Sequence, residues 1–175
     1  MEVLEDLDKY MVETYKSMRE TGLLLGSIGS NGRPNAMTIG WGLIGIIWNK
    51  PIFLVAVRIS RYTHKLLEES GVFTVNVPRE DMNQICEFCG TVSGRDVDKF
   101  EKAGLRWRMG SLVKAPIIEG CPIAYECKVI YKNSVSLQDL SKSIVESIYP
   151  RRDWHTLYYG EILKIHGNIV ISGRD

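Results

Sequence analysis

Hydrophobic and polar positions alternate along much of the chain with a period of two, which is typical of β-strands. The stretches with this pattern, or with a short uninterrupted apolar run, are 22–28, 35–43, 52–57, 72–77, 123–131 and 155–171, the last interrupted around 166–168. Residues 30–34, Ser-Asn-Gly-Arg-Pro, form a turn signal, because an Asn-Gly pair accepts the positive φ angles of tight turns. The strands on either side are predicted to form an antiparallel hairpin in a β-rich domain.

Residues 35–43 alternate strictly between large and small side chains. Asn35, Met37, Ile39, Trp41 and Leu43 share one face, and Ala36, Thr38, Gly40 and Gly42 share the other. Glycine weakens the interior of a strand, so two glycines on one face suggest that another sheet or the ring of a ligand approaches the backbone there. The next stretch, 52–57, is β-branched and continuously apolar, which predicts a strand buried on both faces.

Apolar residues at helical spacing predict helices between the strands. The predicted helices are 3–18, 61–70, 81–88, a segment that follows Ser93-Gly94 and ends near Gly104, and 134–147 with Ser136 as its N-cap. In the first helix Leu4, Leu7, Met11 and Tyr15 share a face that we expect to pack on the sheet. A membrane-surface helix is the alternative, although the acidic early polar face disfavours it. Because no repeat or linker is evident, residues 1–175 are predicted to form a single domain.

A basic, hydroxyl-rich turn follows the apolar strand at 52–57. It reads Arg58-Ile-Ser60-Arg61-Tyr62-Thr63-His64-Lys65, and Ser60 or Thr63 is the expected N-cap of the helix that follows. The start of a helix presents free N–H groups and the positive end of the helix dipole, and here arginines and hydroxyls surround it. The turn is therefore a candidate phosphate site. The alternative is an ordinary helix start with solvated surface arginines.

Composition and charge restrict the class of protein. The 175 residues are 45% hydrophobic and 25% charged, as in an ordinary globular domain, and the formal net charge is +1. This balance argues against a nucleic-acid or membrane surface, which would need an excess of basic residues. We find no apolar stretch long enough to span a bilayer, and the N-terminus is too charged for a signal peptide. A cytoplasmic location is the expectation.

The cysteines do not form a metal-binding pattern. Cys86 and Cys89 make a CxxC pair, but Cys121 and Cys127 lack the spacing of a second pair. The histidines at 64, 155 and 166 are not grouped with them in the sequence. We therefore predict no metal site and interpret the cysteines as structural, with a redox dithiol as the alternative.

Several ordered motifs resemble one known family. They are Asn35-Ala36-Met37-Thr38-x-x-Trp41-Gly42, Lys50-Pro51, Val57-Arg58-x-Ser60-Arg61-Tyr62-Thr63, Cys89-Gly90-Thr91-x-Ser93-Gly94-Arg95-Asp96-x-Asp98-Lys99-Phe100, and His155-Thr156-Leu157-x-x-Gly160-Glu161-Ile162. Together they resemble the flavin reductase-like family with an FMN-binding split barrel, and most of all its flavoredoxin branch. The resemblance covers residues 23–169.

The resemblance implies a mostly β fold, an antiparallel Greek-key barrel of six or a similar number of strands with peripheral helices. It also implies a homodimer with FMN at the subunit interface. The face of Trp41 and Leu43 could contribute to that interface, although we expect one of the two to be core.

The resemblance further implies a set of site residues. The cofactor-binding set is Asn35, Ala36, Met37, Thr38, Trp41, Arg58, Ser60, Arg61, Tyr62, Thr63, Ser93, Gly94 and Lys99. Of these, Arg58, Ser60, Arg61 and Thr63 would hold the phosphate, and Asn35, Met37 and Thr38 would meet the ring or ribityl chain. Lys99 and Arg95 are candidates for a cation near the N1–C2=O side of the flavin, where positive charge favours the reduced ring. His155 is the catalytic candidate, facing the ring edge or the nicotinamide.

The function that this resemblance implies is that of an FMN-binding oxidoreductase. In the first hypothesis NADH or NADPH gives a hydride to flavin N5, and the electrons pass to free flavin, a ferric complex or a protein. The second hypothesis is a flavoredoxin-like electron carrier that binds FMN without using a nicotinamide. A third is a pyridoxamine-phosphate-oxidase-like domain or a flavin-free binding module on the same barrel.

Overall fold

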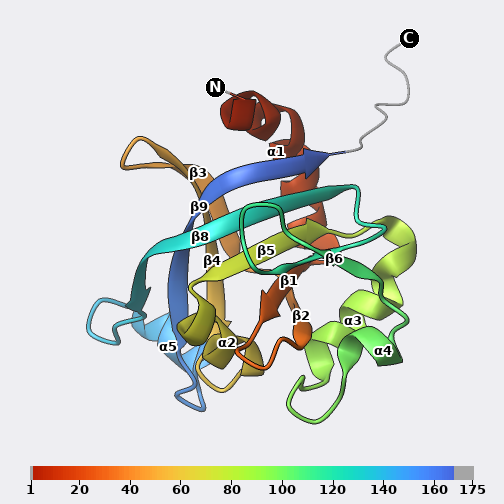
Figure 1. Cartoon of the computed structure of the whole chain (residues 1–175). Helices are drawn as coiled ribbons and strands as arrows, with labels where there is room; N and C mark the ends of the chain where they lie inside the picture. Colours follow the sequence, from red (N-terminus) through yellow and green to blue (C-terminus); the bar gives the residue numbers. More distant parts are fainter. Residues whose placement is uncertain (1, 168–175) are drawn as a thin grey trace.

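The computed structural model describes residues 2–167 (Figure 1). Its elements are α1 (Glu2–Glu20), β1 (Leu23–Ile28), β2 (Pro34–Ile39), β3 (Gly42–Ile47), β4 (Lys50–Arg58), α2 (Tyr62–Ser70), β5 (Val72–Val77), a 3₁₀ turn (Glu80–Met82), α3 (Asn83–Thr91), α4 (Lys99–Lys102), β6 (Trp107–Met109), β7 (Pro116–Ile118), β8 (Ile123–Ser134), α5 (Lys142–Ile148) and β9 (His155–Gly167). Most strands of the sequence interpretation are confirmed. Within the described residues no helix is long and apolar enough to cross a membrane.

One curled antiparallel sheet of seven strands organises the molecule, in the order β2-β1-β5-β8-β9-β4-β3 (Figure 1). The strands β6 and β7 form a separate pair. The predicted hairpin is confirmed, because β1 and β2 pair antiparallel with Leu25 opposite Met37. Although β2 and β3 follow each other in the chain, they form the two edges of the sheet. The sheet therefore curls toward a barrel but remains open between these edges.

The prediction of a single strand over 35–43 is wrong. The strand ends at Ile39, the chain turns at Gly40 and Trp41, and β3 begins at Gly42 on the opposite edge. At this crossing the backbone N–H of Ala56 in β4 donates to the carbonyl of Trp41 over 3.4 Å. The expected number of about six strands becomes seven because this stretch contributes to two strands.

One of the two glycines of this stretch, Gly42, marks a close approach, and the approaching group belongs to the protein. A Cβ on Gly42 would lie 2.7 Å from the carbonyl oxygen of Leu54 in β4, so only glycine fits there without a shift. Beyond the turn, Trp41 and Leu43 are 46% and 67% exposed, which contradicts the expectation that one of them is core. The prediction for 52–57 is confirmed, because Ile52 to Val55 are all buried.

Helix α1 packs on the sheet as predicted, but through a different face. Its buried residues are Leu7, Tyr10, Thr14 and Met18. Leu4, Met11 and Tyr15, which were expected on the buried face, are exposed. Two contacts fix the observed orientation: Thr14 Oγ1 lies 2.6 Å from the Tyr125 hydroxyl, and Tyr10 fills space beside Gly167 where a Cβ would not fit. These tertiary contacts cannot be read from helical spacing.

The predicted helix over 134–147 is shorter than expected and begins later. Strand β8 continues through Ser134, because residues 128–134 pair with residues 156–161 of β9. The helix in this region, α5, starts at Lys142 with Ser141 as its N-cap residue, so Ser136 is not the cap. Strand β9 runs without a break through His166 and Gly167, against the predicted interruption. The part of that prediction beyond Gly167 lies outside the described residues.

The core has two parts on the two sides of β1 and β2. The larger lies between α1 and the concave sheet and contains Phe53, Phe73 and Tyr125. The smaller lies under α3 and α4 and contains Leu24, Ala36, Cys86, Cys89 and Phe100. Strand β2 thus contacts both cores. Both faces of this strand are therefore packed where it borders the candidate site.

Candidate functional site

Two adjoining pockets lie where β2 and β4 run toward α2. The first, here called the basic pocket, has a volume of about 230 Å³, and the second, the strand pocket, about 170 Å³. Met37, Arg58 and Arg61 line both, so the two pockets adjoin along these residues. Together they form one cleft. Its basic part also contains Arg95 and Lys99, and its strand part contains Ile39, Trp41 and Ala56.

The structure brings nearly all of the predicted site residues to this cleft. Those that line the basic pocket are Asn35, Met37, Arg58, Ser60, Arg61, Tyr62, Thr63, Ser93, Gly94 and Lys99. Those that line the strand pocket are Met37, Thr38, Trp41, Arg58, Arg61 and His155. Ala36 lines neither pocket, and its backbone carbonyl instead accepts a hydrogen bond from Lys99. Residues up to 120 positions apart in the chain therefore share one site.

The turn between β4 and α2 opens the basic pocket. Helix α2 begins at Tyr62 with Arg61 as its N-cap residue and with no side-chain capping bond, so the prediction of Ser60 or Thr63 as the cap is wrong. Thr63 lies inside the first turn, where its hydroxyl accepts from Asn35 Nδ2 over 2.9 Å. The uncapped first turn leaves N–H groups without an intrahelical partner. They add to the positive potential of the pocket.

The arginines around this turn differ in whether their guanidinium groups already donate hydrogen bonds to the protein. Arg58 donates to the carbonyls of Asp153 at 2.7 Å and Ile148 at 3.3 Å, which holds the loop before β9. Arg95 donates to the Ser60 carbonyl over 2.9 Å. Within residues 2–167 the guanidinium group of Arg61 has no hydrogen bond or ion pair to protein. Arg61 is thus the cation most available to a ligand.

Lys99 is a buried cation at the base of the pocket, only 4% exposed. Its ammonium group donates to the carbonyls of Ala36 at 2.9 Å and Cys89 at 2.7 Å, and so ties β2 to α3. Burial lowers the pKa of Lys99 to about 8. The preceding Asp98 caps α4 by accepting from the N–H groups of Phe100 and Glu101. This cap fixes the position of Lys99.

Asn35 offers an unused acceptor beside the pocket. Its side chain is 3% exposed, and its Nδ2 donates to Thr63, while its Oδ1 has no partner among the described residues. A Cβ on Gly94 would lie 2.1 Å from this oxygen, so only glycine allows the loop to pack here. A buried polar atom without a partner costs free energy, on the order of 1–3 kcal/mol. Such an atom at a pocket wall favours a ligand that can donate to it.

His155 closes the strand pocket. The residue is 6% exposed, its ring lies 4.8 Å from that of Trp41, and its Nδ1 lies 2.7 Å from the Tyr149 hydroxyl. Burial, followed by the Arg58 and Arg61 guanidinium groups, lowers the pKa of His155 to about 4. A neutral imidazole therefore faces the pocket near pH 7.

Comparison with known proteins identifies the chain. A family model for the flavin reductase like domain matches residues 16–169. The chain belongs to the flavin reductase-like family. The matched span includes every residue of both pockets.

Individual relatives of this flavin reductase-like chain agree with the assignment. An uncharacterized protein of Archaeoglobus fulgidus is 33% identical over 143 residues, which are 81% of this chain and 71% of that protein. The structure of flavoredoxin of Desulfovibrio vulgaris (Miyazaki F) is 27% identical with a TM-score of 0.69, covering 84% of this chain and 69% of that chain.

The fold of the flavin reductase-like chain is the split barrel. A structure from Shewanella frigidimarina, named as a flavin reductase with a split barrel domain, has a TM-score of 0.69 at 15% identity and covers 94% of this chain and 77% of that chain. The predicted mostly β class with peripheral helices is confirmed. The seven-stranded sheet is not closed into a full barrel.

Two functional candidates in this flavin reductase-like site escaped the sequence interpretation. Asp153 lines the basic pocket, and Tyr149 contacts both Arg58 and His155. Neither residue belongs to a motif or to a predicted element, and the next predicted strand begins only at 155. Arg58 and His155 are direct partners across β4 and β9. This pairing brings the loop just before β9 next to Arg58, and the pairing is not visible in the sequence.

The cysteines of α3 lie in the core behind the site. Cys86 and Cys89 are buried, and all four cysteines are free thiols. Burial raises the pKa of Cys86 to about 11, so its thiol stays protonated. Among the described residues no group of three or more potential ligands is placed to hold a metal ion. A packing role for Cys86 and Cys89 agrees with these surroundings.

The protonation of His155 gives a first testable prediction. With an ordinary pKa of 6.5 when unfolded and about 4 when folded, this histidine gains a proton earlier in the unfolded chain as the pH falls. The contribution of this group to native stability should therefore decline between pH 6.5 and 4, by no more than roughly 4 kcal/mol. NMR titration of the imidazole resonances, assigned with His155→Phe, should show a neutral ring down to about pH 5. A midpoint near 6.5 would contradict the assignment.

Proposed function

We propose that this protein is an FMN-binding oxidoreductase of the NAD(P)H-dependent flavin or ferric reductase type. The observation that carries the proposal is the pair of adjoining pockets, one strongly cationic beside the start of α2 and the other lined by Trp41 and His155, with Arg58 and Arg61 between them. Their shape and polarity suit a molecule with a phosphate at one end and a ring at the other. Membership of the flavin reductase-like family supports the same choice.

The residues of the cleft fit FMN. Arg61 and the first-turn N–H groups of α2 would hold the phosphate, with Thr63 at the base of the pocket. The unpartnered Oδ1 of Asn35 would accept from a ribityl hydroxyl or a ring N–H. Gly94 allows the loop at 93–94 to pack against Asn35 and Tyr62 at the wall of the basic pocket. Trp41, Met37 and His155 would enclose the ring from the strand pocket.

The protein would supply position and electrostatics for the reaction. FMN, when bound, accepts a hydride at N5 and passes electrons onward. Lys99 would place a positive charge at the base of the basic pocket without leaving its carbonyl partners, and its pKa near 8 keeps it mostly protonated at pH 7. His155 is neutral near pH 7, so it would act through hydrogen bonding and shape and not as a source of charge. NADH or NADPH would be the donor.

A flavoredoxin-like FMN electron carrier is the second candidate function. The observation that favours it is the similarity to flavoredoxin of Desulfovibrio vulgaris at 27% identity. A carrier would use the same cofactor contacts and would differ only in lacking productive nicotinamide binding.

One experiment separates these functions. The purified protein is loaded with FMN without oxygen, and NADH and then NADPH are added while the flavin absorbance is followed. Loss of the flavin absorbance within seconds of adding a nicotinamide supports the reductase. If neither nicotinamide changes the spectrum but a chemical reductant then removes the flavin absorbance, the carrier is supported. Failure to retain FMN in any buffer would leave the flavin-free binding module. A blank with free FMN measures the background reaction.

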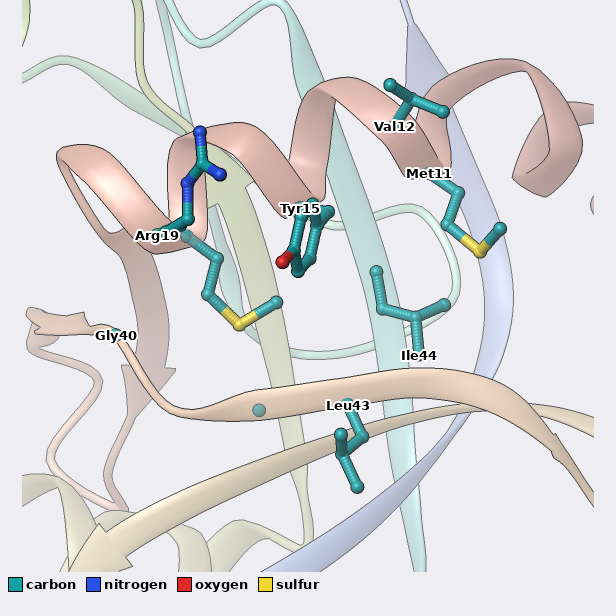
Figure 2. A pocket seen from close by; sticks show the side chains of 9 residues that line it. Met11, Val12, Tyr15, Arg19, Gly40, Leu43 and Ile44 are labelled. Atoms are coloured by element: carbon teal, nitrogen blue, oxygen red, sulfur yellow. The ribbon is translucent and has the colours of Figure 1, made fainter.

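We further propose that the protein is a homodimer whose interface lies next to the cleft. A pocket of about 530 Å³ lies between α1 and β3 and is lined mainly by apolar residues (Figure 2). In Figure 2, Met11 and Tyr15 of α1 face Ile44 of β3 across it. Gly40 lines both this pocket and the strand pocket, so a second copy seated here would also border the cofactor.

The dimer gives a prediction of its own. Leu43→Glu on the exposed strand β3 should convert dimers to monomers, because it places a charge in the apolar contact. Sedimentation velocity at several concentrations measures the change. Leu112→Glu, also on an exposed leucine but outside this pocket, is the matched control. A wild-type chain that is monomeric at every concentration would refute the dimer.

A further inference from the structure

The carboxylate of Asp153 occupies hydrogen-bond donors at the cationic end of the cleft. Its Oδ2 accepts from the Ser60 hydroxyl at 2.6 Å, and its Oδ1 accepts from the Ser60 backbone N–H at 3.2 Å. These two donors belong to the turn between β4 and α2, and both face the basic pocket, which Asp153 also lines. A side-chain anion therefore sits where the cleft binds anions best.

Asp153 lies among basic side chains in this pocket. The pocket is lined by Arg58, Arg61, Arg95 and Lys99, and Asp153 is the one acidic residue among the described residues that line it. The carboxylate thus offsets part of a strongly cationic site.

The loop that carries Asp153 is held through its backbone and not only through the carboxylate. Arg58 donates to the Asp153 carbonyl at 2.7 Å and to the Ile148 carbonyl at 3.3 Å. The neighbouring Arg152 adopts a φ of 56°, which is uncommon for a residue other than glycine. The side chain of Asp153 is half-buried. Because Arg58 is bonded to backbone carbonyls, its hold on the loop does not depend on the contact between the Asp153 carboxylate and Ser60.

We propose that Asp153 is a specificity-determining residue that holds the phosphate subsite in the ligand-free protein and yields it to the phosphate of FMN. The inference rests on the proposed function. A phosphate carries more negative charge and more acceptor oxygens than a carboxylate, so it competes for the Ser60 donors and the arginines. A flavin without a phosphate has no group that takes over these donors. The carboxylate therefore reduces the affinity for FMN and leaves that for riboflavin unchanged.

The test compares FMN with riboflavin, which lacks the phosphate, in Asp153→Asn. Removing the charge keeps the size of the side chain and should raise FMN affinity about tenfold, since one charge-assisted bond no longer competes. Riboflavin affinity should stay within about twofold, a change of under 0.5 kcal/mol. Quenching of flavin fluorescence measures both. Asp139→Asn, an exposed acid outside the pocket, is the matched control and should change neither affinity.

Each remaining outcome has a defined meaning. Weaker FMN binding in Asp153→Asn, or equal changes for FMN and riboflavin, would show that Asp153 supports the loop, and would overturn the proposal. Unchanged affinity for both ligands would overturn it as well.

A second probe separates this inference from the proposed function. Inorganic phosphate is titrated into both proteins, and the amide resonances of Ser60 and Arg61 are followed. Tighter phosphate binding by Asp153→Asn, in a protein that binds neither flavin, would refute the FMN assignment and retain the anion subsite. Equal phosphate binding by both proteins would refute the subsite, whatever the flavins do.

Discussion

FMN binding is expected to weaken by at least about a hundredfold when Arg58 and Arg61 are both replaced with alanine. Each charge-assisted hydrogen bond to the phosphate is worth on the order of 1.5 to 3 kcal/mol, so two losses correspond to at least this factor. The effect should reside mainly in Arg61→Ala, because Arg61 has no protein partner within residues 2–167, whereas Arg58 also holds the loop before β9. Fluorescence titration of the single and double variants measures it.

Two controls make this result specific to the phosphate site. Lys65→Ala removes a positive charge from the same helix but outside the pocket, where Lys65 pairs with Glu69 at 3.7 Å. It should leave FMN affinity nearly unchanged. Riboflavin binding should be nearly equal in wild type and Arg61→Ala. Unaltered FMN affinity in a folded double variant, verified by circular dichroism, would show that the phosphate binds elsewhere.

The largest loss of stability is expected from Glu126→Ala, far from the cleft. Glu126 is fully buried, and its carboxylate accepts from the N–H groups of Ser111 at 3.0 Å, Leu112 at 2.6 Å and Val113 at 2.9 Å, and from His166 Nε2 at 2.6 Å. Alanine leaves these donors without an acceptor in a closed space. We expect a loss of about 3 to 5 kcal/mol in the free energy of unfolding, measured by urea denaturation.

Acid titration tests the same group through Glu126→Gln, which keeps the shape and removes the charge. Burial raises the pKa of Glu126, but hydrogen bonds from His166, Leu112 and Ser111 outweigh it and lower the pKa to about 2. The unfolded chain has the ordinary value of 4.5, so it binds the proton first as the pH falls. The stabilisation is complete above pH 4.5 and is lost between 4.5 and 2. The advantage of wild type over Glu126→Gln should shrink in that window, and a constant difference would contradict the assignment.

The local signals at the candidate site were strong enough to be recognised in the sequence. Arg58, Ser60 and Arg61 follow a buried strand and precede a helix. Such a junction predicts an anion site without any knowledge of the tertiary structure. The motif around Ser93 and Gly94 was recognisable only through its resemblance to a family, because nothing in its spacing shows what it packs against. In the structure Gly94 meets Asn35, from a strand almost sixty residues earlier.

The contacts of the cationic residues could not be predicted. The sequence indicates that Lys99 and Arg58 are positively charged, but not that Lys99 is directed to the carbonyls of Ala36 and Cys89, or that Arg58 holds the loop at 148–153. Asp153 was missed for the same reason. A loop without periodicity carries no information about the surface on which it rests.

The strands over 22–28, 52–57 and 72–77, the β1–β2 hairpin, the position of the β4–α2 junction and the family could all be predicted from the sequence, because each depends on residues that are neighbours in the chain. Only the tertiary structure decided that residues 35–43 divide between two edges of the sheet, which face of α1 is buried, and where β8 ends. It also decided that Asp153 reaches Ser60. These features depend on contacts between segments that are distant in the chain. The partner of a backbone hydrogen bond or of a buried side chain is set by the fold and not by the residues next to it in the sequence.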